Sequence, residues 1–530
     1  MMSKVHLIFI LWLLNTVLLV AQDQEFLRGK VLDKNTGEPV VFATVRILGK
    51  AKGVITNMDG GFRLPLEFRE AGESIAITSM GYTKKEYGLQ QLSPSDINII
   101  YLEAGVLELS EAVVKAKGKR FRNLNAKQIV QKAIDAIPNN YPATSFSLVG
   151  YYRDYQYKDS TYLNLNEGIF EVFDQGFDQL DDSNTESLIY QWSTNTDFPQ
   201  DSSARQSYNY KSLSKVIEKA RLDAHGGNEF RILRIHDAIR NFNVGSYDFI
   251  GTMKTDFTKN HYFLRGADTT KDGNELYTIK FWIFFPNYRA NGTIYISKFD
   301  FAIHRLEYTM YDEKKKGDDK KRNKHGHFQK PIFDITTEYN SQDGNMYLNY
   351  ISFHNTFILN VPPVFRVDDY AVDFDEQCFT VEYNTRPLEE LAMDLKNYDV
   401  EFKNRRVKIR TIKRLKNKIY LIPALIDEKK YEIFGEILDA VKKEKDLNEL
   451  VSIKVSNVRD TLGNLVNKWT APEYEQYREF FVQEVKPDNR APFDGLFMDK
   501  AMPLFGEQPM DEPANGDYYW MNTPLKKSIN

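Results

Sequence analysis

The chain has 530 residues, with 70 Lys and Arg against 74 Asp and Glu, and a formal net charge of −4. A balance this close to neutral gives no electrostatic case for binding nucleic acid. The single cysteine, Cys378, excludes a disulfide within the chain, so stability must come from the core, and we expect this thiol to be buried and inert. Phenylalanine and tyrosine, with 35 and 31 copies, favour half-buried pleated surfaces and predict a β-rich body.

The first residues have the pattern of a secretory signal. Lys4 precedes an apolar run over residues 7–20, and the small residue Ala21 and Gln22 follow it. The run is short for a membrane span. We therefore predict that residues 1–22 are a signal peptide and that the protein is exported. No later segment approaches a membrane helix in length, so we expect no transmembrane helix in the mature chain.

Residues 23–104 alternate in the manner of short strands. Val41, Ala43, Val45 and Ile47 fall on one face of a strand, and Phe42, Thr44, Arg46 and Leu48 fall on the other. Further short apolar segments recur between clusters of Gly, Pro, Asn and Asp. This spacing predicts a small antiparallel β-sandwich.

Three ordered motifs in residues 24–104 resemble a known family. They are G-K-V-x-D-x-x-T-G-E-P-V-x-F-A-x-V, then G-V-x-T-N-x-D-G-x-F, then S-M-G-Y. This order is similar to the carboxypeptidase-regulatory-like (transthyretin-like) domain of secreted and outer-membrane proteins of Bacteroidetes-type bacteria. The resemblance implies a fold and an envelope compartment. It does not imply peptidase activity, because in the enzymes that name the family this domain is an accessory to the catalytic one.

Residues 105–140 are predicted to form a linker and a helix. Asn125 can cap a helix that presents one apolar stripe, and Pro138 is expected to stop it. The stripe consists of Ile129, Val130, Ala133, Ile134 and Ile137. In transporters with the same front domain, a similar linker leads to a plug and barrel, but here it leads to a helix.

Residues 141–398 are predicted to form a larger antiparallel β domain. The expected strands cover residues 146–157, 162–173, 276–285, 293–299, 302–311, 332–339, 346–359 and 365–374. The unit from Gly292 to Tyr308 is similar to strand pairs in curved, half-barrel envelope proteins that carry lipid or lipoprotein. A curved sheet could hold an apolar ligand, and a sheet packed on its own helices explains the same pattern. Residues 212–224 are predicted to be helical, whereas residues 230–241 fit a helix and a strand equally well.

Few residues suggest metal chemistry. His304 and Glu307 have the spacing of a zinc pair, but in a strand residues three apart point to opposite faces. His325 and His327 could chelate a metal, yet they follow a charged run typical of a solvated loop. Asn57, Asp59 and Gly60 are better explained by a hairpin turn than by calcium binding. We assign no catalytic residue, no cofactor and no metal ligand.

The last third of the chain is predicted to be less regular. Residues 399–450 contain a basic segment, with nine Lys or Arg over residues 403–418, expected to be a basic edge strand or helix that faces either solvent or anionic lipid. A helix is expected over residues 427–445. Residues 451–530 are predicted to form an irregular, Pro-rich tail, with Phe493, Phe497 and Trp520 pinning it to the body.

The sequence therefore predicts a mainly β protein, with an N-terminal transthyretin-like β-sandwich followed by a larger antiparallel β domain with short helices. We expect an exported, non-catalytic cell-envelope protein, periplasmic or outer-membrane-associated, that acts as a binding or assembly module. Its partner would be an envelope protein or an apolar or glycan ligand, and any membrane contact would be peripheral. Three alternatives stay open: a lipid or glycan carrier with a curved-sheet site, a zinc hydrolase, and a component of a TonB-dependent transport system.

Overall fold

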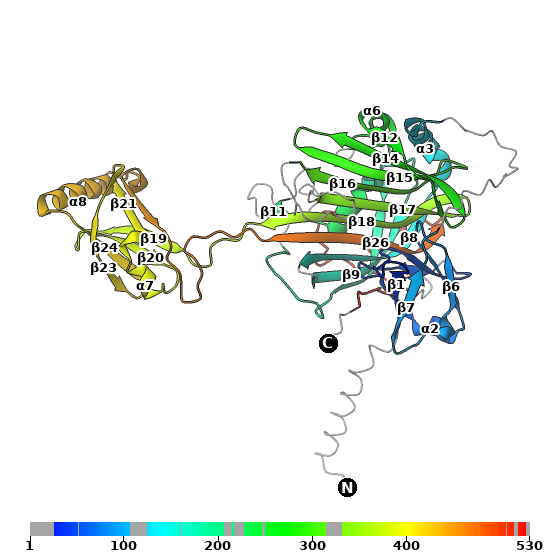
Figure 1. Cartoon of the computed structure of the whole chain (residues 1–530), viewed down its shortest axis with the longest axis horizontal. Coiled ribbons are helices and arrows are strands. Elements are labelled where there is room, and N and C mark those ends of the chain that lie inside the picture. Colours follow the sequence, from blue (N-terminus) through cyan, green and yellow to red (C-terminus); the bar gives the residue numbers. More distant parts are fainter. Residues whose placement is uncertain are drawn as a thin grey trace, which may run out of the picture. The chain divides into compact units, whose positions relative to one another are not determined.

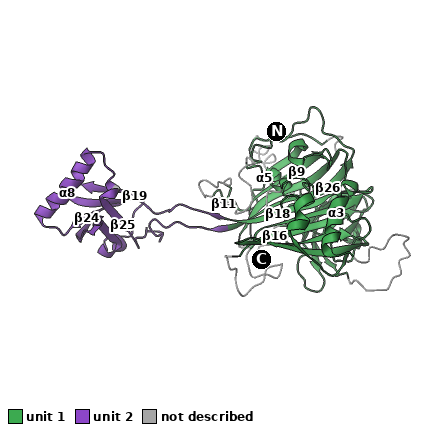
Figure 2. Cartoon of the chain, turned by 90° about the horizontal axis from the view of Figure 1, so that it is seen from above, with its two compact units in different colours: residues 1–211, 215–357, 474–530 green, residues 212–214, 358–473 purple. Residues whose placement is uncertain are grey.

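The structure is a computed structural model that divides into two compact units. It describes residues 26–50, 52–105, 124–158, 161–205, 215–216, 227–245, 250–313, 331–504, 506–513 and 518–525. Unit 1 comprises residues 1–211, 215–357 and 474–530, and unit 2 comprises residues 212–214 and 358–473 (Figure 2). Unit 2 is thus an insertion in the sequence of unit 1. The predicted signal peptide and most of the predicted linker lie outside the described residues.

The front of unit 1 is the predicted β-sandwich. One sheet has the order β4-β1-β7 and the other β3-β2-β5-β6, with β1 and β7 parallel and the other pairs antiparallel. Its elements are β1 (Phe26–Asp33), β2 (Thr44–Ile47), β3 (Gly53–Ile55), β4 (Gly61–Pro65), α2 (Leu66–Glu70), β5 (Ser74–Thr78), β6 (Lys85–Gly88), η2 (Leu89–Gln91) and β7 (Ile97–Leu102). Val45 and Ile47 are buried between the sheets, as their alternation predicts.

The predicted strand over residues 40–48 is interrupted at Phe42. This residue has a φ of 60°, so the regular strand begins only at Thr44, and Val41 is half-buried rather than part of the core. The Asn57 to Gly60 segment is a turn, as predicted: the Asn57 side chain accepts a hydrogen bond from the backbone N–H of Gly61 at 2.8 Å, and Gly60 has a φ of 74°. Glycine is suited to this left-handed conformation.

A 12-stranded antiparallel sheet forms the body of unit 1 (Figure 1). Its main path runs β10-β9-β8-β26-β18-β17-β16-β15-β14-β12, while β11 pairs with β18 and β13 pairs with β14. The strands are β8 (Phe146–Lys158), β9 (Thr161–Asp174), β10 (Glu186–Thr194), β11 (Lys215–Val216), β12 (Tyr262–Arg265), β13 (Thr269–Lys271), β14 (Asn274–Phe284), β15 (Tyr288–Ser297), β16 (Ile303–Asp312), β17 (Pro331–Gln342), β18 (Asn345–Leu359) and β26 (Glu473–Pro487). The long predicted strands of this sheet are confirmed within a few residues at their ends, except that β15 begins at Tyr288, five residues before the predicted start at residue 293.

Short helices cover one face of this sheet. They are α3 (Ala126–Asn140), α4 (Asp181–Asn184), α5 (Glu229–Ile235), the π-helical turn η4 (Met253–Phe257) and α6 (Thr258–Asn260). The five residues of the predicted stripe of α3 are all buried, and Asn125 forms a capping box with Gln128. Pro138 lies inside α3, which ends at Asn140, so the predicted stop was two residues early. Within the predicted helix over residues 212–224, the described residues Lys215–Val216 instead form β11.

Unit 2 has its own two small sheets and its own core. The sheets have the orders β19-β20-β24-β23 and β22-β21-β25. The elements are β19 (Val367–Asp373), β20 (Cys378–Tyr383), α7 (Glu389–Ala392), η5 (Leu395–Asn397), β21 (Tyr398–Phe402), β22 (Arg405–Arg406), β23 (Ile409–Leu415), β24 (Lys418–Pro423), α8 (Asp427–Lys442), η6 (Leu447–Glu449) and β25 (Val451–Val455). Phe379, Val381, Leu421 and Phe434 are among its core residues. Burial raises the pKa of the Cys378 thiol to about 11.

The predicted boundaries after residue 141 were wrong in two respects. The domain predicted over residues 141–398 ends at Phe357 in unit 1, and the predicted irregular tail contains β26, a 15-residue strand in the middle of the large sheet. The charges of β26 obscured it in the sequence, because Arg478 and Glu479 are buried in ion pairs with residues far away in the chain. A strand can bury such charges only when a partner neutralises them.

The C-terminal residues beyond β26 connect the front domain to the sheet. Trp520 is buried against Phe68, its indole N–H donates to the carbonyl of Arg63 at 3.0 Å, and its own carbonyl accepts from Gln483 at 2.7 Å. Trp520 and Phe497 thus pack on the body as predicted, whereas Phe493 is fully exposed. Within the described part of the chain, no helix combines the length and the apolar composition needed to cross a bilayer.

Candidate functional site

A hollow of about 560 Å³ lies on three neighbouring strands of the large sheet. Its side chains come from alternate positions of β14, β15 and β16, so they share one face of the sheet. They are Lys280, Trp282, Phe284, Arg289, Asn291, Thr293, Glu307, Thr309 and Tyr311. The hollow is therefore a product of strand register, which brings together residues about 30 positions apart in the sequence.

The register arranges these nine side chains in three rows across the strands. One row is Phe284, Arg289 and Tyr311; the second is Trp282, Asn291 and Thr309; the third is Lys280, Thr293 and Glu307. Strands lie about 4.8 Å apart, so the three residues of each row are close neighbours, although Thr309 and Tyr311 are buried. Each row begins on β14 with an aromatic ring or a cation, and its members on β15 and β16 carry hydrogen-bonding groups.

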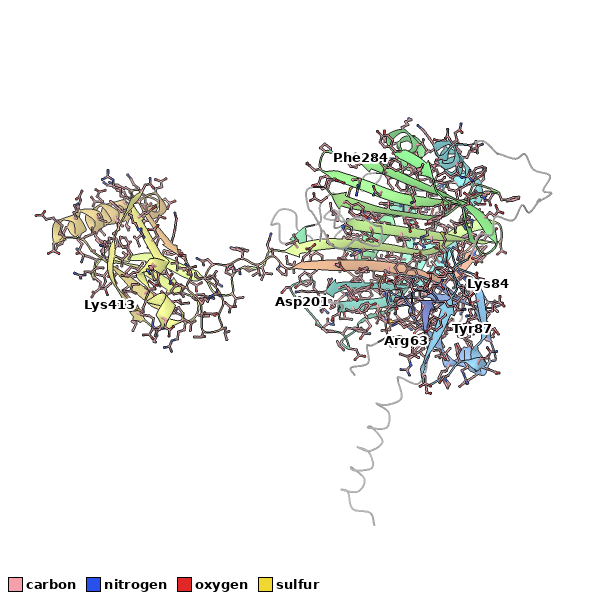
Figure 3. All side chains as sticks on the ribbon, viewed as in Figure 1. Arg63, Lys84, Tyr87, Asp201, Phe284 and Lys413 are labelled. Carbon is pink, nitrogen blue, oxygen red and sulfur yellow. The ribbon has the colours of Figure 1, made fainter. Side chains whose placement is uncertain are left out.

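An exposed aromatic platform borders the hollow. Tyr262 of the edge strand β12 stands opposite Trp282, and the two rings stack with centroids 5.9 Å apart and planes 18° from parallel. Tyr262 is 61% exposed and Phe284 is 60% exposed. Figure 3 shows Phe284 at this edge of the sheet. Exposed rings of this size, grouped on one face, mark a place where apolar surface is available to a ligand.

Fixed charges lie beside the third row. Arg305 donates to Glu307 at 2.9 Å and also lies 3.6 Å from Glu338, which binds Lys271 at 2.6 Å. Burial alone would raise the pKa of Glu338, but Lys271 and Arg305 outweigh it and hold that pKa below its usual value. Burial, with a contribution from Glu307, raises the pKa of Tyr295 to about 12. These contacts hold Glu307 as an oriented hydrogen-bond acceptor at the floor of the hollow.

The front domain docks on the same face of the sheet. Tyr350 is paired with Glu338, which is paired with Arg305, so Tyr350 faces the same side as the hollow. The ring of Phe42 packs 5.1 Å from that of Tyr350 and 5.8 Å from that of Phe481. Asn349 adds a hydrogen bond to Thr44 at 3.0 Å. The docked domain covers one part of this face, and the hollow occupies another.

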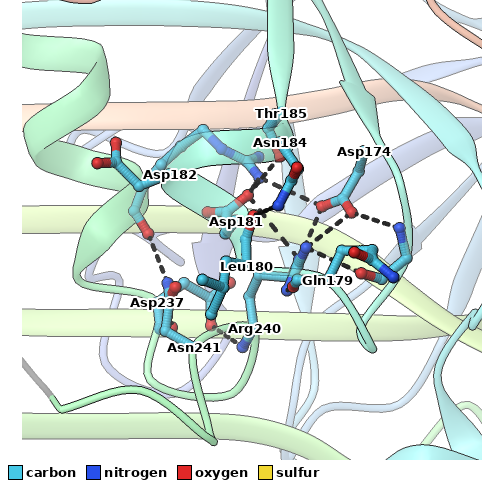
Figure 4. Close-up of polar contacts among 12 residues, drawn as sticks. Asp174, Gln179, Leu180, Asp181, Asp182, Asn184, Thr185, Asp237, Arg240 and Asn241 are labelled. Atoms are coloured by element: carbon cyan, nitrogen blue, oxygen red, sulfur yellow. Dashed lines mark hydrogen bonds and ion pairs between the residues drawn. The ribbon is translucent and has the colours of Figure 1, made fainter.

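The opposite face carries a buried ion network (Figure 4). Arg240 donates to both carboxylate oxygens of Asp174, at 2.8 and 3.0 Å, and Arg234 donates to Asp181 at 2.5 Å. Arg240 also binds the carbonyls of Gly176 and Gln179, each at 3.0 Å. Each of these charges has a partner, as burial requires. The network ties the segment around α5 to β9, which is a structural role.

The sequence candidates for metal chemistry lie elsewhere or have other partners. His304 is buried where the register of β16 shifts, and burial followed by the charge of Lys271 lowers its pKa to about 4. Glu307 is engaged by Arg305 instead. His325 and His327 lie outside the described residues. Among the residues that the structure describes, no group of three or more His, Cys, Asp or Glu is placed to hold a metal ion.

Sequence reasoning singled out none of the aromatic residues of the hollow. It predicted the strands that carry Trp282 and Thr293, and the alternation along them was the available signal. The grouping of Tyr262, Trp282, Asn291 and Glu307 depends on which strands pair and in which register, and that information is absent from a single sequence.

The front domain belongs to a recognised family. A family model described as a CarboxypepD_reg-like domain matches residues 27–114. This match and the observed sandwich confirm the carboxypeptidase-regulatory-like domain predicted from the three motifs, and in this chain that domain precedes a large antiparallel β domain. No curated protein matches the chain.

Two solved structures share a low similarity with this chain. One is a domain assigned to outer membrane lipoprotein sorting from Vibrio parahaemolyticus, with 9% identity, a TM-score of 0.18, and coverage of 44% of this chain and 86% of that chain. The other is a DUF1329 family protein from Desulfovibrio piger, with 12% identity, a TM-score of 0.20, and coverage of 44% and 87%. These TM-scores are too low to support an argument about fold or function.

Proposed function

We propose that this protein is an exported, non-catalytic envelope protein that binds a carbohydrate in the hollow on β14, β15 and β16. The observation that carries the proposal is the stacked pair Tyr262 and Trp282 beside the polar rows of the hollow. Export and an envelope location are supported by the predicted leader and by the family of the front domain. The docked front domain would act as an assembly or spacing unit.

The chemistry of the hollow matches that of a sugar ring. A sugar has an apolar face of C–H groups, which packs on flat aromatic rings, and a rim of hydroxyls, which need donors and acceptors close together. Trp282 supplies the first, and Thr293 and Glu307 supply the second. The volume lies within the range of roughly 300–1,000 Å³ that is usual for small-molecule sites.

A lipid fits this site less well than a sugar. The hollow contains Lys280, Arg289 and Glu307, and an acyl chain would have to desolvate them without replacing their hydrogen bonds. The apolar face of the sheet is occupied by the protein itself: Phe230 packs 4.8 Å from Phe170, and Phe257 packs 4.9 Å from Phe281. The sequence suggested two ligand classes, lipid and glycan, and of these we therefore favour the carbohydrate.

The test is binding of short neutral oligosaccharides of glucose, mannose and N-acetylglucosamine, measured by calorimetry with the mature protein. Replacing Trp282 with Ala should weaken binding by about 2 kcal/mol, or roughly 30-fold, because large rings at the centre of a site act as hot spots.

Phe299→Ala is the matched control, because Phe299 is 92% exposed and lies outside the hollow. It should leave binding unchanged. If none of the oligosaccharides binds, or if W282A and F299A bind them equally well, the proposal fails. Cell fractionation of the native protein tests export separately, and recovery of the mature chain in the cytosol would contradict it.

A further inference from the structure

Unit 2 concentrates positive charge in one short segment. Residues 403–418 contain nine Lys or Arg and no Asp or Glu. Without these nine, the remaining 61 basic and 74 acidic residues of the chain have a formal charge of −13. The segment, which we call the basic edge, is therefore opposite in sign to the rest of the protein.

About half of the charges of the basic edge are paired within unit 2. Lys403 pairs with Glu436, Arg406 with Asp399 at 2.9 Å, Arg414 with Glu389 at 3.0 Å, and Lys418 with Glu382 at 4.0 Å. The other five are exposed, and none forms an ion pair with a carboxylate of the described residues. These five are Arg405, Lys408, Arg410, Lys413 and Lys416.

Arg405, Arg410 and Lys413 lie in the outer strands of two sheets, while Lys408 lies in the connection between these strands and Lys416 in the turn after the second. β22 is the outer strand of the order β22-β21-β25, and β23 is the outer strand of the order β19-β20-β24-β23. Val407 and Ile412 are buried and anchor the segment to the core of unit 2. Figure 3 labels Lys413 on this unit. The cations thus stand on a fixed backbone, which maintains their spacing.

Protection of an edge strand does not account for this pattern. Charged side chains, Lys above all, prevent an exposed edge from pairing with another chain, but the basic edge carries nine cations in 16 residues. β19, at the other edge of the same sheet, carries Asp368, Asp369 and Asp373 and no cation. The two edges are therefore both charged but opposite in sign, so the sign of the basic edge needs another explanation.

We propose that the basic edge docks unit 2 on an anionic lipid surface through phosphate headgroups. Five unpaired cations on a fixed rim complement a surface of negative charges, and clustered Lys and Arg are attracted to such surfaces. Leu415 lies between Arg414 and Lys416 and is 63% exposed, so it can enter the boundary between headgroups and acyl chains. This contact is peripheral and independent of carbohydrate binding in the hollow.

The test is co-sedimentation of the full mature chain with vesicles. Vesicles of equal parts phosphatidylcholine and phosphatidylglycerol should bind the protein at low salt, whereas vesicles of phosphatidylcholine alone should not. Binding should fall as salt is added, because salt screens exposed charges. Replacing Arg410, Lys413 and Lys416 with Gln should weaken binding by roughly 100-fold, at about five-fold for each cation.

The matched control replaces Lys429 and Lys442 of α8, and Lys443 just after its end, with Gln. These residues are exposed, belong to the same unit, and change the net charge equally, but acidic residues surround them in the sequence. The control should keep most of the binding. Equal binding to both kinds of vesicle, an equal loss in both triple variants, or binding to a soluble acidic polysaccharide but not to vesicles would overturn the proposal.

Discussion

Phe281 and Trp282 are neighbours in β14, yet they face opposite sides of the large sheet. Phe281 is 1% exposed and packs on Phe257 and His261, on the side covered by helices. Trp282 is half-buried and stacks on the exposed ring of Tyr262 at the rim of the hollow. The comparison shows that one face of the sheet is closed by the protein's own residues, while part of the other face is left available to a ligand.

The ion pairs on the two faces also differ in how accessible they are to solvent. On the closed face, Arg240 and Asp174 form a buried pair with two hydrogen bonds. On the open face, Arg305 and Glu307 pair while each remains partly accessible. A buried pair cannot exchange its partner without a large desolvation cost, whereas an accessible carboxylate can accept a further hydrogen bond. The open face is therefore suited to recognition and the closed face to stability.

The largest expected effect comes from truncating the closed face. Phe281→Ala should lower the free energy of unfolding by about 4 kcal/mol, because it removes a buried ring and leaves a cavity. Urea unfolding followed by circular dichroism measures this change. A loss below about 1 kcal/mol would mean that this face is not the packed core described above.

The second effect concerns the buried ion pair. Arg240→Met should cost about 3 kcal/mol, because Asp174 would be left as an uncompensated buried charge. Arg265→Met is the control: Arg265 binds Asp268 at 2.8 Å but is exposed, so its loss should cost less than about 1 kcal/mol. Similar losses in the two variants would contradict the distinction between the network and a surface pair.

The third effect is a pH dependence that arises from Asp237. Burial raises its pKa from 3.8 to about 6, although its carboxylate accepts hydrogen bonds from Tyr339 at 2.7 Å and from the backbone of Arg240 at 3.0 Å. A raised pKa means that the folded state binds the proton more tightly than the unfolded state. The contribution of protonated Asp237 to the free energy of unfolding is thus fully present below about pH 4. It is lost as the pH rises through 6.

Asp237→Asn tests this dependence, because the amide keeps the hydrogen-bonding shape but does not titrate. The stability of the variant relative to the native protein should rise by about 2 kcal/mol between pH 4 and pH 7. Urea unfolding at several pH values gives the difference directly. A difference that stays constant over this range would show that Asp237 does not titrate there.

The smallest expected effect on stability is that of Trp282→Ala. Because its ring is half-buried and packs mainly on one exposed neighbour, its loss should cost only about 1 kcal/mol, far less than the loss of Phe281. The same unfolding measurement compares the two adjacent positions. A loss as large as that of F281A would make Trp282 a core residue and would remove the basis for an open site.

Much of the fold followed from local sequence patterns. The alternation in β8, β9, β16, β17 and β18 predicted these strands, and Asn125 with its apolar stripe predicted α3. The ambiguous segment around α5 became a helix because Phe230 packs among Tyr152, Phe170 and Phe480, contacts that no local window contains. The insertion of unit 2 between β18 and β26 was missed for the same reason.

The sequence predicted the strands that carry the candidate site, but it did not predict the order in which these strands pair. By itself it determined the front sandwich and the position of the long strands, because alternation, turn residues and ordered motifs are local properties. Its prediction of a leader falls outside the described residues. Only the tertiary structure decided that Trp282, Asn291 and Glu307 share one hollow and that β26 lies in the middle of the sheet. Strand pairing depends on contacts between distant residues, and these contacts form only when the whole sheet assembles.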